Sequence, residues 1–254
     1  LPHPDAWIDQ LTWHPQQNLL AYGVGSQVQI WDVEHNRLVA NLEFASSSVL
    51  HLAWHPDGHL LAVSGHGGVK VWDTADWSAE PRLIAVPGAS LYAGWSSHGR
   101  YLASGNLDRT LTVVEWDSPP PWLMQGFPGK VRQVAWADGT ASKTPLLAAA
   151  CVEGITLWRL SDPDKGWKSQ VLQHHQDRVN AIAFQPDHCL LASAGADGKL
   201  CLWHQGRPRQ TLQAKSGLST LAWHPSGFYL ATGSISGEVS VWKPQAAGGR
   251  GFGS

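Results

Sequence analysis

Histidine and cysteine are the residues of this chain with the widest chemistry, because both can bind metals and act in catalysis. The sequence has 13 histidines and 3 cysteines. His14, His55 and His224 each stand in the phrase LTWHP or LAWHP. A second group lies between residues 174 and 204 and consists of His174, His175, His188, Cys189, Cys201 and His204. Imidazole and thiolate groups are common zinc ligands, so metal handling must be weighed against the elements that position these residues.

Motifs for covalent or phosphate chemistry are missing from the sequence. It contains no GxSxG nucleophile elbow, P-loop, HExxH zinc motif or CxxC pair. The run GGRGFG at 248–253 neither follows a predicted strand nor opens a helix, so we interpret it as part of a flexible tail. We therefore predict that the protein is not an enzyme and has no catalytic, cofactor-binding or metal-binding residues.

Charge and composition exclude several classes of partner. The formal charge is −2, from 18 Lys and Arg against 20 Asp and Glu, so no global positive field attracts nucleic acid. The longest apolar stretch, 146–152, is far shorter than the ~18–20 residues that cross a bilayer. Three scattered cysteines favour a reducing compartment, and we expect the cytoplasm. If Asp197 and Gly198 form a hairpin turn, Cys201 faces Ala194 and not Cys189.

Two ladders of aromatic residues indicate an internal repeat. The first, at separations of 41, 41, 41, 48 and 39 residues, is formed by Trp13, Trp54, Trp95, Trp136, Phe184 and Trp223. The second, which closes phrases such as VQIWD and VKVWD, is formed by Trp31, Trp72, Trp116, Trp158, Trp203 and Trp242. A shared period of about 40 residues indicates six copies of one supersecondary unit.

Each copy consists of short runs typical of strands. In the copy that begins near residue 178, the runs VNAIAF, CLLASAG and KLCLW are separated by the turns QPDH and ADG. Such short runs, punctuated by Gly and Pro, leave no room for helices. A weaker fourth run, here RQTLQ, follows the closing tryptophan. The first run is apolar on both faces, so each small sheet must be packed between neighbouring sheets.

These motifs resemble the WD40 family of β-propellers, and the resemblance covers residues 6–243. The phrases that carry it are LAWHPDGHLLAVSGHGGVKVWD, LAWHPSGFYLATGSISGEVSVW and AFQPD followed by LLASAGADGKLCLWH. The resemblance implies an all-β WD40-type propeller of six blades, mostly of four antiparallel strands. The implied blades form a single domain at 1–243, followed by a flexible Gly-rich tail at 244–254. Their approximate ranges are 6–43, 48–86, 89–127, 130–173, 178–213 and 217–243.

The resemblance also implies a hydrogen-bond network in each blade. Its members are a histidine before the first strand, a hydroxyl within that strand, an aspartate in the turn between the second and third strands, and the closing tryptophan. One copy has His175, Asp197 and Trp203, but Ala181 stands where the hydroxyl is expected. The last copy has Thr220 at that position but no aspartate. We therefore expect an incomplete network in every blade, with packing supplying more of the stability.

The propeller architecture gives the histidines structural roles. His14, His55 and His224 fall in the tight turn between first and second strands, where proline fixes φ. They lie at one rim of the predicted disc, but in separate blades, so we interpret them as turn residues. The second group scatters to opposite ends of one blade. His51, on an inner strand, is interpreted as a satisfied buried imidazole.

The two ends of the chain leave the last blade short of a strand. LPHPDAWI at 1–8 aligns with LQHHQDRV at 172–179, so Leu1 corresponds to the end of a fourth strand. The run KPQAAGGRGFGS after Trp242 is too rich in Gly and Pro for a good strand. The last blade is therefore expected either to have three strands or to be closed by residues near the N-terminus. We favour a native chain that extends before Leu1.

A binding surface is predicted where loops enter the first strands and where second strands turn into third strands, because both open on one propeller face. The candidate protein-binding residues read from these positions are Trp7, Asp9, Arg109, Lys130, Arg132, Arg178 and Asn180. Lys130, Arg132 and Arg178 form a positive sector. Such a sector favours an acidic peptide or protein segment as the partner.

The sequence thus predicts a noncatalytic WD40 scaffold that mediates protein–protein interaction around the propeller axis. The partner is expected to be a protein or peptide, with no nucleic acid, membrane or cofactor involved. One alternative is a metal-handling or metal-sensing protein that uses the histidine-rich rim. Another is the recognition module of a larger signalling protein.

Overall fold

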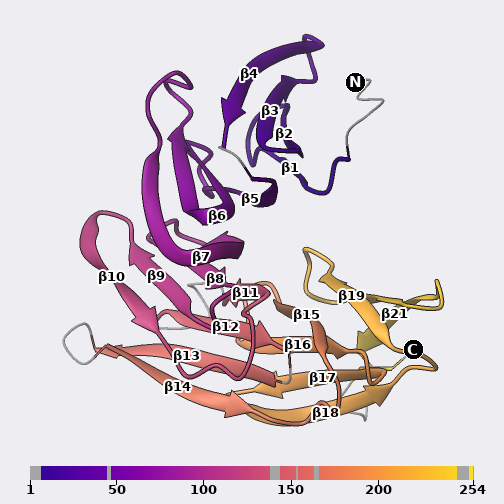
Figure 1. The fold of residues 1–254 in the computed structure, drawn as a ribbon. Coiled ribbons are helices and arrows are strands. Elements are labelled where there is room, and N and C mark those ends of the chain that lie inside the picture. The colour runs from indigo at the N-terminus through magenta and orange to yellow at the C-terminus, as the bar shows by residue number, and fades with distance from the viewer. Residues whose placement is uncertain are drawn as a thin grey trace. The chain divides into compact units, whose positions relative to one another are not determined.

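The computed structural model describes residues 7–44, 47–137, 144–152, 154–162, 166–244 and 252–253. Within these ranges every regular element is a strand, so the predicted all-β class is confirmed (Figure 1). The chain forms two compact parts, residues 1–126 and residues 127–254, and each is described by itself. Among the described residues, no helix has the length and apolar character needed to cross a membrane.

The first part contains two antiparallel sheets. The strands of the four-stranded sheet are, in order, β1 (Leu11–Trp13), β2 (Leu19–Val24), β3 (Gln27–Asp32) and β4 (Arg37–Glu43). The strands of the six-stranded sheet are β5 (Val49–Trp54), β6 (Leu60–Asp73), β7 (Arg82–Trp95), β8 (Tyr101–Asn106), β9 (Leu111–Glu115) and β10 (Ser118–Met124). Each strand pairs with its neighbour along the chain, as short turns between β-prone runs predict.

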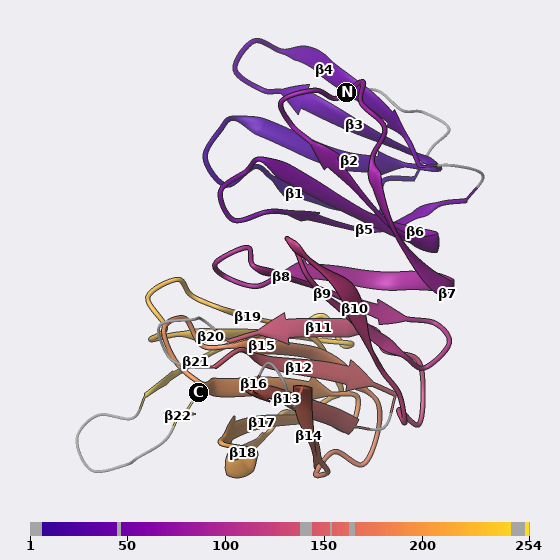
Figure 2. The same cartoon turned by 90° about the vertical axis from the view of Figure 1, so that its left-hand side faces the viewer.

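The second part contains three four-stranded sheets. The first is formed by β11 (Gln133–Trp136), β12 (Leu146–Cys151), β13 (Gly154–Asp162) and β14 (Gly166–Leu172). The second, labelled in Figure 2, is formed by β15 (Val179–Phe184), β16 (Leu190–Gly195), β17 (Lys199–His204) and β18 (Arg207–Gln213). The third is formed by β19 (Leu218–Trp223), β20 (Leu230–Ser234), β21 (Val239–Pro244) and β22 (Phe252–Gly253).

In the part of the chain that the structure describes, the sheets form five blades, so the prediction of six is wrong. The repeats expected at 48–86 and 89–127 share the six-stranded sheet, because β7 runs from the last strand of one repeat into the first strand of the next. Its residues 82–85 pair with β6, and its residues 90–95 pair with β8. The sequence period remains six-fold, but the hydrogen-bonded sheets number five.

Strand β6 folds back on itself and thereby supplies two arms of the shared sheet. Gly67 and Gly68 have φ values of +87° and +136°, and the Thr74 amide donates to the His59 carbonyl at 3.0 Å. Only glycine adopts such backbone angles without steric cost. A side chain at Gly68 would also collide with the carbonyl of Ile84. The GHGG phrase is therefore the turn of a hairpin inside one continuous strand.

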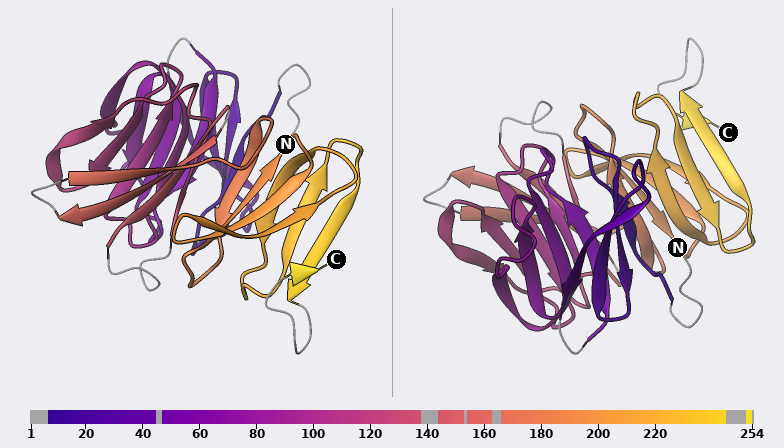
Figure 3. Two further views of the ribbon diagram at one scale, coloured as in Figure 1. Left: turned by 90° about the horizontal axis from the view of Figure 1, so that it is seen from below. Right: turned by 90° about the horizontal axis from the view of Figure 1, so that it is seen from above.

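The final sheet takes its fourth strand from the C-terminal segment. Phe252 pairs with Pro244 and Gly253 with Lys243 in β22, in the sheet drawn yellow in Figure 3. Neither expected arrangement, three strands or closure from the N-terminal side, anticipated this pairing. Residues 1–6, and residues 245–251 and 254 of the predicted tail, lie outside the described residues.

Within each part of the chain, tryptophans of the first ladder donate hydrogen bonds to the repeat before their own. Trp54 Nε1 donates to the Thr12 carbonyl at 3.3 Å, and Trp223 Nε1 donates to the Ala183 carbonyl at 3.2 Å. Apolar residues on both faces of the sheets pack around these contacts, as in the cluster of Ile30, Leu52 and Leu61. Burying one such side chain stabilises the fold by about 1.5–3 kcal/mol. The repeats therefore depend on one another for their cores.

Cys201 lies one position away from its predicted register. It pairs with Ser193 on β16, whereas Leu200 pairs with Ala194. The hairpin turn is longer than the two residues assumed, because β16 ends at Gly195 and β17 begins at Lys199. Among the described residues, Cys151, Cys189 and Cys201 form no disulfide.

Candidate functional site

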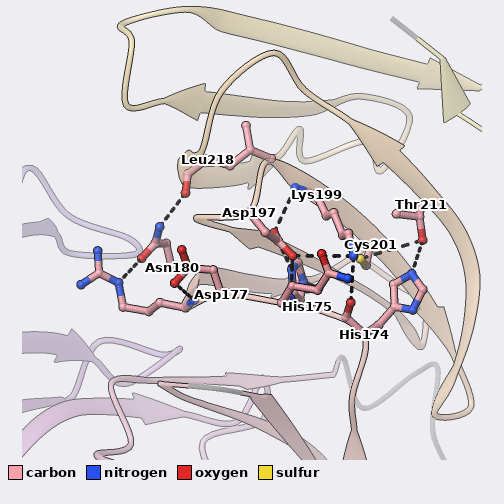
Figure 4. Close-up of polar contacts among 12 residues, drawn as sticks. His174, His175, Asp177, Asn180, Asp197, Lys199, Cys201, Thr211 and Leu218 are labelled. Carbon is pink, nitrogen blue, oxygen red and sulfur yellow. Dashed lines mark hydrogen bonds and ion pairs between the residues drawn. The ribbon is translucent and has the colours of Figure 1, made fainter.

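The loop that enters β15 is fixed to the turn between β16 and β17. The Asp197 carboxylate in that turn accepts hydrogen bonds from the backbone amides of Gln176 at 2.8 Å and Lys199 at 3.1 Å. Gly198, with φ of +76°, completes the turn. One aspartate thus joins two loops that lie at the same end of the sheet (Figure 4).

A chain of hydrogen bonds continues from Asp197 into the sheet. Trp203 Nε1 donates to Ser193 Oγ at 2.8 Å, and His175 Nε2 lies 2.8 Å from the same oxygen. His175 Nδ1 lies 3.1 Å from Asp197 Oδ1. The Asp197 carboxylate fixes the direction of the chain because it can only accept: His175 Nδ1–H donates to Asp197, and the Ser193 hydroxyl donates to the unprotonated His175 Nε2. Every member therefore has a partner.

The electrostatics of this chain favour a neutral imidazole beside an ionised carboxylate. Burial lowers the pKa of His175, whose side chain is 2 % exposed, although the Asp197 carboxylate opposes that shift. Burial raises the pKa of Asp197, but hydrogen bonds from Gln176, His175 and Lys199 outweigh it and leave that pKa below its usual value. The pair is a hydrogen bond between a neutral group and an anion.

Ser193, His175 and Asp197 have the hydrogen-bond order of a Ser-His-Asp catalytic triad. A nucleophilic serine must reach its substrate, but Ser193 is 0 % exposed. Its hydroxyl oxygen is also occupied by the indole N–H of Trp203. The arrangement therefore holds the loop, the turn and the sheet together and presents no reactive atom to solvent.

The hydroxyl of this network was sought on the wrong strand. We expected it at the position of Ala181 on the first strand, but Ser193 on the second strand supplies it. In the last sheet, similarly, Trp242 Nε1 donates to Thr232 Oγ1 at 2.9 Å, while Thr220 is exposed. The expectation of an incomplete network in every blade is therefore wrong. The signal was present in the phrases LAS at 191–193 and LAT at 230–232.

An open hollow of about 540 Å³ lies beside this network, lined by Val152 and residues 173–178. Arg178, at its edge, donates from Nε to Asn180 Oδ1 at 2.8 Å. Asn180 Nδ2 donates in turn to the Leu218 carbonyl at 2.7 Å (Figure 4). These bonds fix the direction of the Arg178 side chain, while the residue itself remains exposed.

Two further cations stand at the equivalent end of the neighbouring sheet. Lys130 and Arg132 are exposed on either side of the fully buried Val131. The Gln133 side chain joins β11 to β15, donating to the Ile182 carbonyl at 3.1 Å and accepting from the Ile182 amide at 2.8 Å. The loop before β11 therefore lies next to the loop before β15. The structure thus brings Lys130 and Arg132 to the side of the sheet that carries Arg178.

The seven predicted binding residues are divided between the two parts. Lys130, Arg132, Arg178 and Asn180 belong to the second part. Trp7, Asp9 and Arg109 belong to the first. A common face for all seven stays a prediction.

In the first part, Trp7 is 86 % exposed and lines a hollow of about 360 Å³ together with Asp9. Gln10, Gly23 and Val49 also contribute to this hollow. Arg109 is exposed in the turn between β8 and β9, where it has a φ of +67°. The first part therefore presents its own polar and aromatic surface.

One carboxylate of the second-part site was missed. Asp177 is exposed, lines the hollow and accepts a hydrogen bond from the Arg178 amide at 2.6 Å. The sequence reasoning considered only the two positions that flank the first apolar residue of each first strand, and Asp177 lies one position earlier. It reduces the positive charge at the edge of the hollow.

Hydrogen bonds hold His14 and His224 in their HP turns. His14 Nδ1 accepts from the amides of Gln16 at 3.1 Å and Gln17 at 3.0 Å, so Nε2 carries the proton that bonds to the Gly58 carbonyl at 3.1 Å. His224 Nδ1 bonds to Ser226 Oγ at 2.7 Å. Both ring nitrogens of His14 are therefore occupied, which leaves it no lone pair for a metal.

Comparisons with known proteins identify the repeat. Residues 36–73, 166–204 and 206–243 match the family model for the WD domain, G-beta repeat. The chain is 36 % identical over 73 residues to small ribosomal subunit protein RACK1 of Candida albicans, a stretch covering 28 % of this chain and 23 % of the relative. It is 27 % identical over 114 residues to protein transport protein sec13 of Emericella nidulans, covering 42 % of this chain and 36 % of the relative. The matches therefore span about a quarter to a third of these relatives.

A solved structure shows the same fold. One chain in the crystal structure of a mitotic checkpoint complex superposes with a TM-score of 0.78 and 20 % sequence identity. The superposition covers 95 % of this chain and 76 % of the other. The likeness is one of fold.

Proposed function

Since this chain is a WD40-repeat protein with a fold of the β-propeller type, we propose that it is a noncatalytic platform that binds a protein or peptide segment. The names of its relatives support this role, because one is a ribosomal subunit protein and another a protein transport protein. The chain of similar fold was solved as part of a multi-protein complex. A fold by itself hosts many functions, so the proposal depends on the surface described above.

The observation that carries the proposal is the cluster of exposed cations in the second part. Arg178 lines an open hollow whose side chains are mostly polar, and Lys130 and Arg132 are exposed before β11 of the adjacent sheet. Single exposed ion pairs contribute only about 0–1 kcal/mol, so affinity must come from several cations acting on one ligand. An extended segment with two or three carboxylates meets that requirement.

Arginine suits such a ligand because its planar guanidinium can bind a carboxylate through two parallel hydrogen bonds. Arg178 is already oriented by Asn180, which reduces the side-chain entropy lost when a ligand binds. Asp177 favours a ligand that places its carboxylates toward Arg132 and Arg178 and away from the 177 side chain. Three scattered cysteines, too few for a disulfide framework, support the cytoplasm as the compartment.

Charge reversal tests the proposal. The double variant Arg132→Glu/Arg178→Glu is compared with wild type and with Lys168→Glu/Arg207→Glu, which reverses two exposed cations on β14 and β18 of the same part. Affinity purification with mass spectrometry should show partners lost by the first variant and retained by the second. Acidic peptides from those partners should bind the first variant at least about tenfold more weakly, equivalent to about 1.4 kcal/mol. Retention of every partner by the first variant would contradict the proposal.

A further inference from the structure

The turn after β5 brings three metal-ligating groups together. His55, Asp57 and His59 occupy alternate positions of this turn, and their ligand atoms all lie within 4.8 Å of one another. His55 Nδ1 is 2.6 Å from Asp57 Oδ1, and His59 Nδ1 contacts the same oxygen. The two imidazole rings meet edge to face, with centroids 4.2 Å apart. No role in the turn requires both histidines to face one carboxylate.

The hydrogen bonds of this turn converge on one carboxylate oxygen. In the HP turn of His14, Nδ1 accepts backbone amides and Nε2–H donates to the Gly58 carbonyl. In His55, Nδ1 instead lies 2.6 Å from Asp57 Oδ1, and the Asp57 amide is 3.4 Å from the same nitrogen. His55 and His59 therefore both direct Nδ1 at the same oxygen. A metal ion that replaces the imidazole protons gains two nitrogen ligands and this carboxylate.

The cluster is open to solvent on one side. His55 is buried, whereas the side chains of Asp57 and His59 are 57 % and 48 % exposed. An ion can therefore reach the site from solvent and keep a coordination position for water or for a ligand from another molecule.

We propose that His55 Nδ1, Asp57 Oδ1 and His59 Nδ1 bind one zinc ion. Two imidazoles and a carboxylate are a donor set that zinc accepts, with bonds of about 2.0–2.2 Å to nitrogen and oxygen. Donors around a tetrahedral ion are then about 3.4 Å apart, so the three groups need only separate slightly. His55 is held for this role by Gly99 on one side and by the Trp95 ring, 4.8 Å away.

The chain contains a matched turn without the ligands. Residues 224–228 read HPSGF where residues 55–59 read HPDGH. The backbones agree, because the amides of His55 and His224 each donate to a carbonyl five residues later at 2.8 Å. Gly58 and Gly227 also agree, with φ values of +84° and +72°. Only Ser226 and Phe228 replace the aspartate and the second histidine.

This match defines the experiment. Metal-free full-length protein without a histidine tag is titrated with zinc chloride in a calorimeter. Wild type should bind one ion in this site. Asp57→Ser/His59→Phe, which copies the 224–228 turn, should bind it at least about 100-fold more weakly, since changes outside the ligands already cost about 10–100-fold. Zinc should raise the melting temperature of wild type and leave that of the variant unchanged.

A reciprocal variant removes no ligand, so its result does not depend on whether the Asp57→Ser/His59→Phe variant folds. Ser226→Asp/Phe228→His writes HPDGH into the second turn and should add one ion to the wild-type stoichiometry. The proposal is overturned if wild type shows no stoichiometric zinc, or if Asp57→Ser/His59→Phe binds zinc as tightly as wild type. Failure of the reciprocal variant to gain an ion would likewise show that these residues do not make a site. None of these outcomes bears on the peptide-binding proposal.

Discussion

The repeats at 178–213 and 48–86 support the same hairpin with different chemistry. Gly195 pairs with Val179 at the end of one hairpin, and Gly65 pairs with Val49 at the same place in the other. A side chain at Gly195 would overlap the ring of His175, whereas a side chain at Gly65 would overlap the ring of Phe44. A ring therefore covers the glycine in both repeats, but it is polar in one and apolar in the other.

The difference shows that the histidine needs a supporting network and the phenylalanine does not. His175 is satisfied by Asp197 and Ser193, and the Asp197 carboxylate in turn fixes the following turn. Phe44 is 1 % exposed and has the ammonium group of Lys70 5.5 Å from its ring centroid. In the repeat at 48–86, Gly67 and Gly68 form the turn without an aspartate. Departure from the family's polar residues is therefore compensated by packing at the same site.

The largest effect is expected at Phe44. Phe44→Ala removes a fully buried ring from above Gly65 and should lower the free energy of unfolding by about 3–5 kcal/mol, the cost of a large-to-small change in a core. Phe228→Ala, at a residue that is 65 % exposed, should change it by less than about 0.5 kcal/mol. Urea denaturation followed by tryptophan fluorescence measures both. A cost below about 1 kcal/mol at Phe44 would mean that the ring does not support the hairpin.

The two repeats also differ in how their buried imidazoles respond to pH. Burial lowers the pKa of His51 in the repeat at 48–86 to about 4, and its ring stacks on Tyr92 with centroids 3.8 Å apart. Because the unfolded chain takes up the proton first, the stabilisation is complete above pH 6.5 and is lost as pH falls toward 4. The loss between pH 7 and pH 5 should be about 2 kcal/mol.

Urea midpoints measured across this pH range check the His51 effect. His51→Phe keeps a stacked ring without a titrating group and should flatten the dependence, whereas His98→Phe, at an exposed position, should leave it unchanged. Some dependence of stability on pH should remain because of His175. Burial also lowers the pKa of His175, although Asp197 opposes that shift. An unchanged slope in His51→Phe would show that His51 does not titrate in this way.

The sequence was sufficient for the elements and their repeat. Short β-prone runs predict the strands, and the tryptophan ladders predict the repeat. The structure adds that indoles such as those of Trp54 and Trp223 contact the preceding repeat. The sequence was not sufficient for the number of sheets. Strands β6 and β7 join two repeats into one sheet because of pairing at their junctions, and periodicity along the chain does not encode that pairing.

The candidate site was also predictable only in part. Alternation along a first strand places Arg132 and Arg178 outside, because Val131 and Val179 must be inside. The Asp177 carboxylate and the Ser193 hydroxyl depend on how a loop and a second strand approach one another in space. The phrases LAS at 191–193 and LAT at 230–232 contain the hydroxyls, but the sequence does not show that a closing tryptophan lies beside them, because that depends on the cross-strand register.

The smallest expected effect comes from removing one buried hydroxyl in each of the two repeats. Ser193→Ala leaves His175 Nε2 and the Trp203 indole N–H without their partner and should cost about 1–2 kcal/mol. Ser64 is equally buried, but among the residues that the structure describes its Oγ has no hydrogen-bond partner. Ser64→Ala should therefore change stability by less than about 0.5 kcal/mol or increase it, because removing an unpaired buried polar group carries no loss. Urea midpoints measure both costs. Equal costs would mean that the hydrogen bonds of Ser193 add no stability beyond that of the unpaired Ser64 hydroxyl.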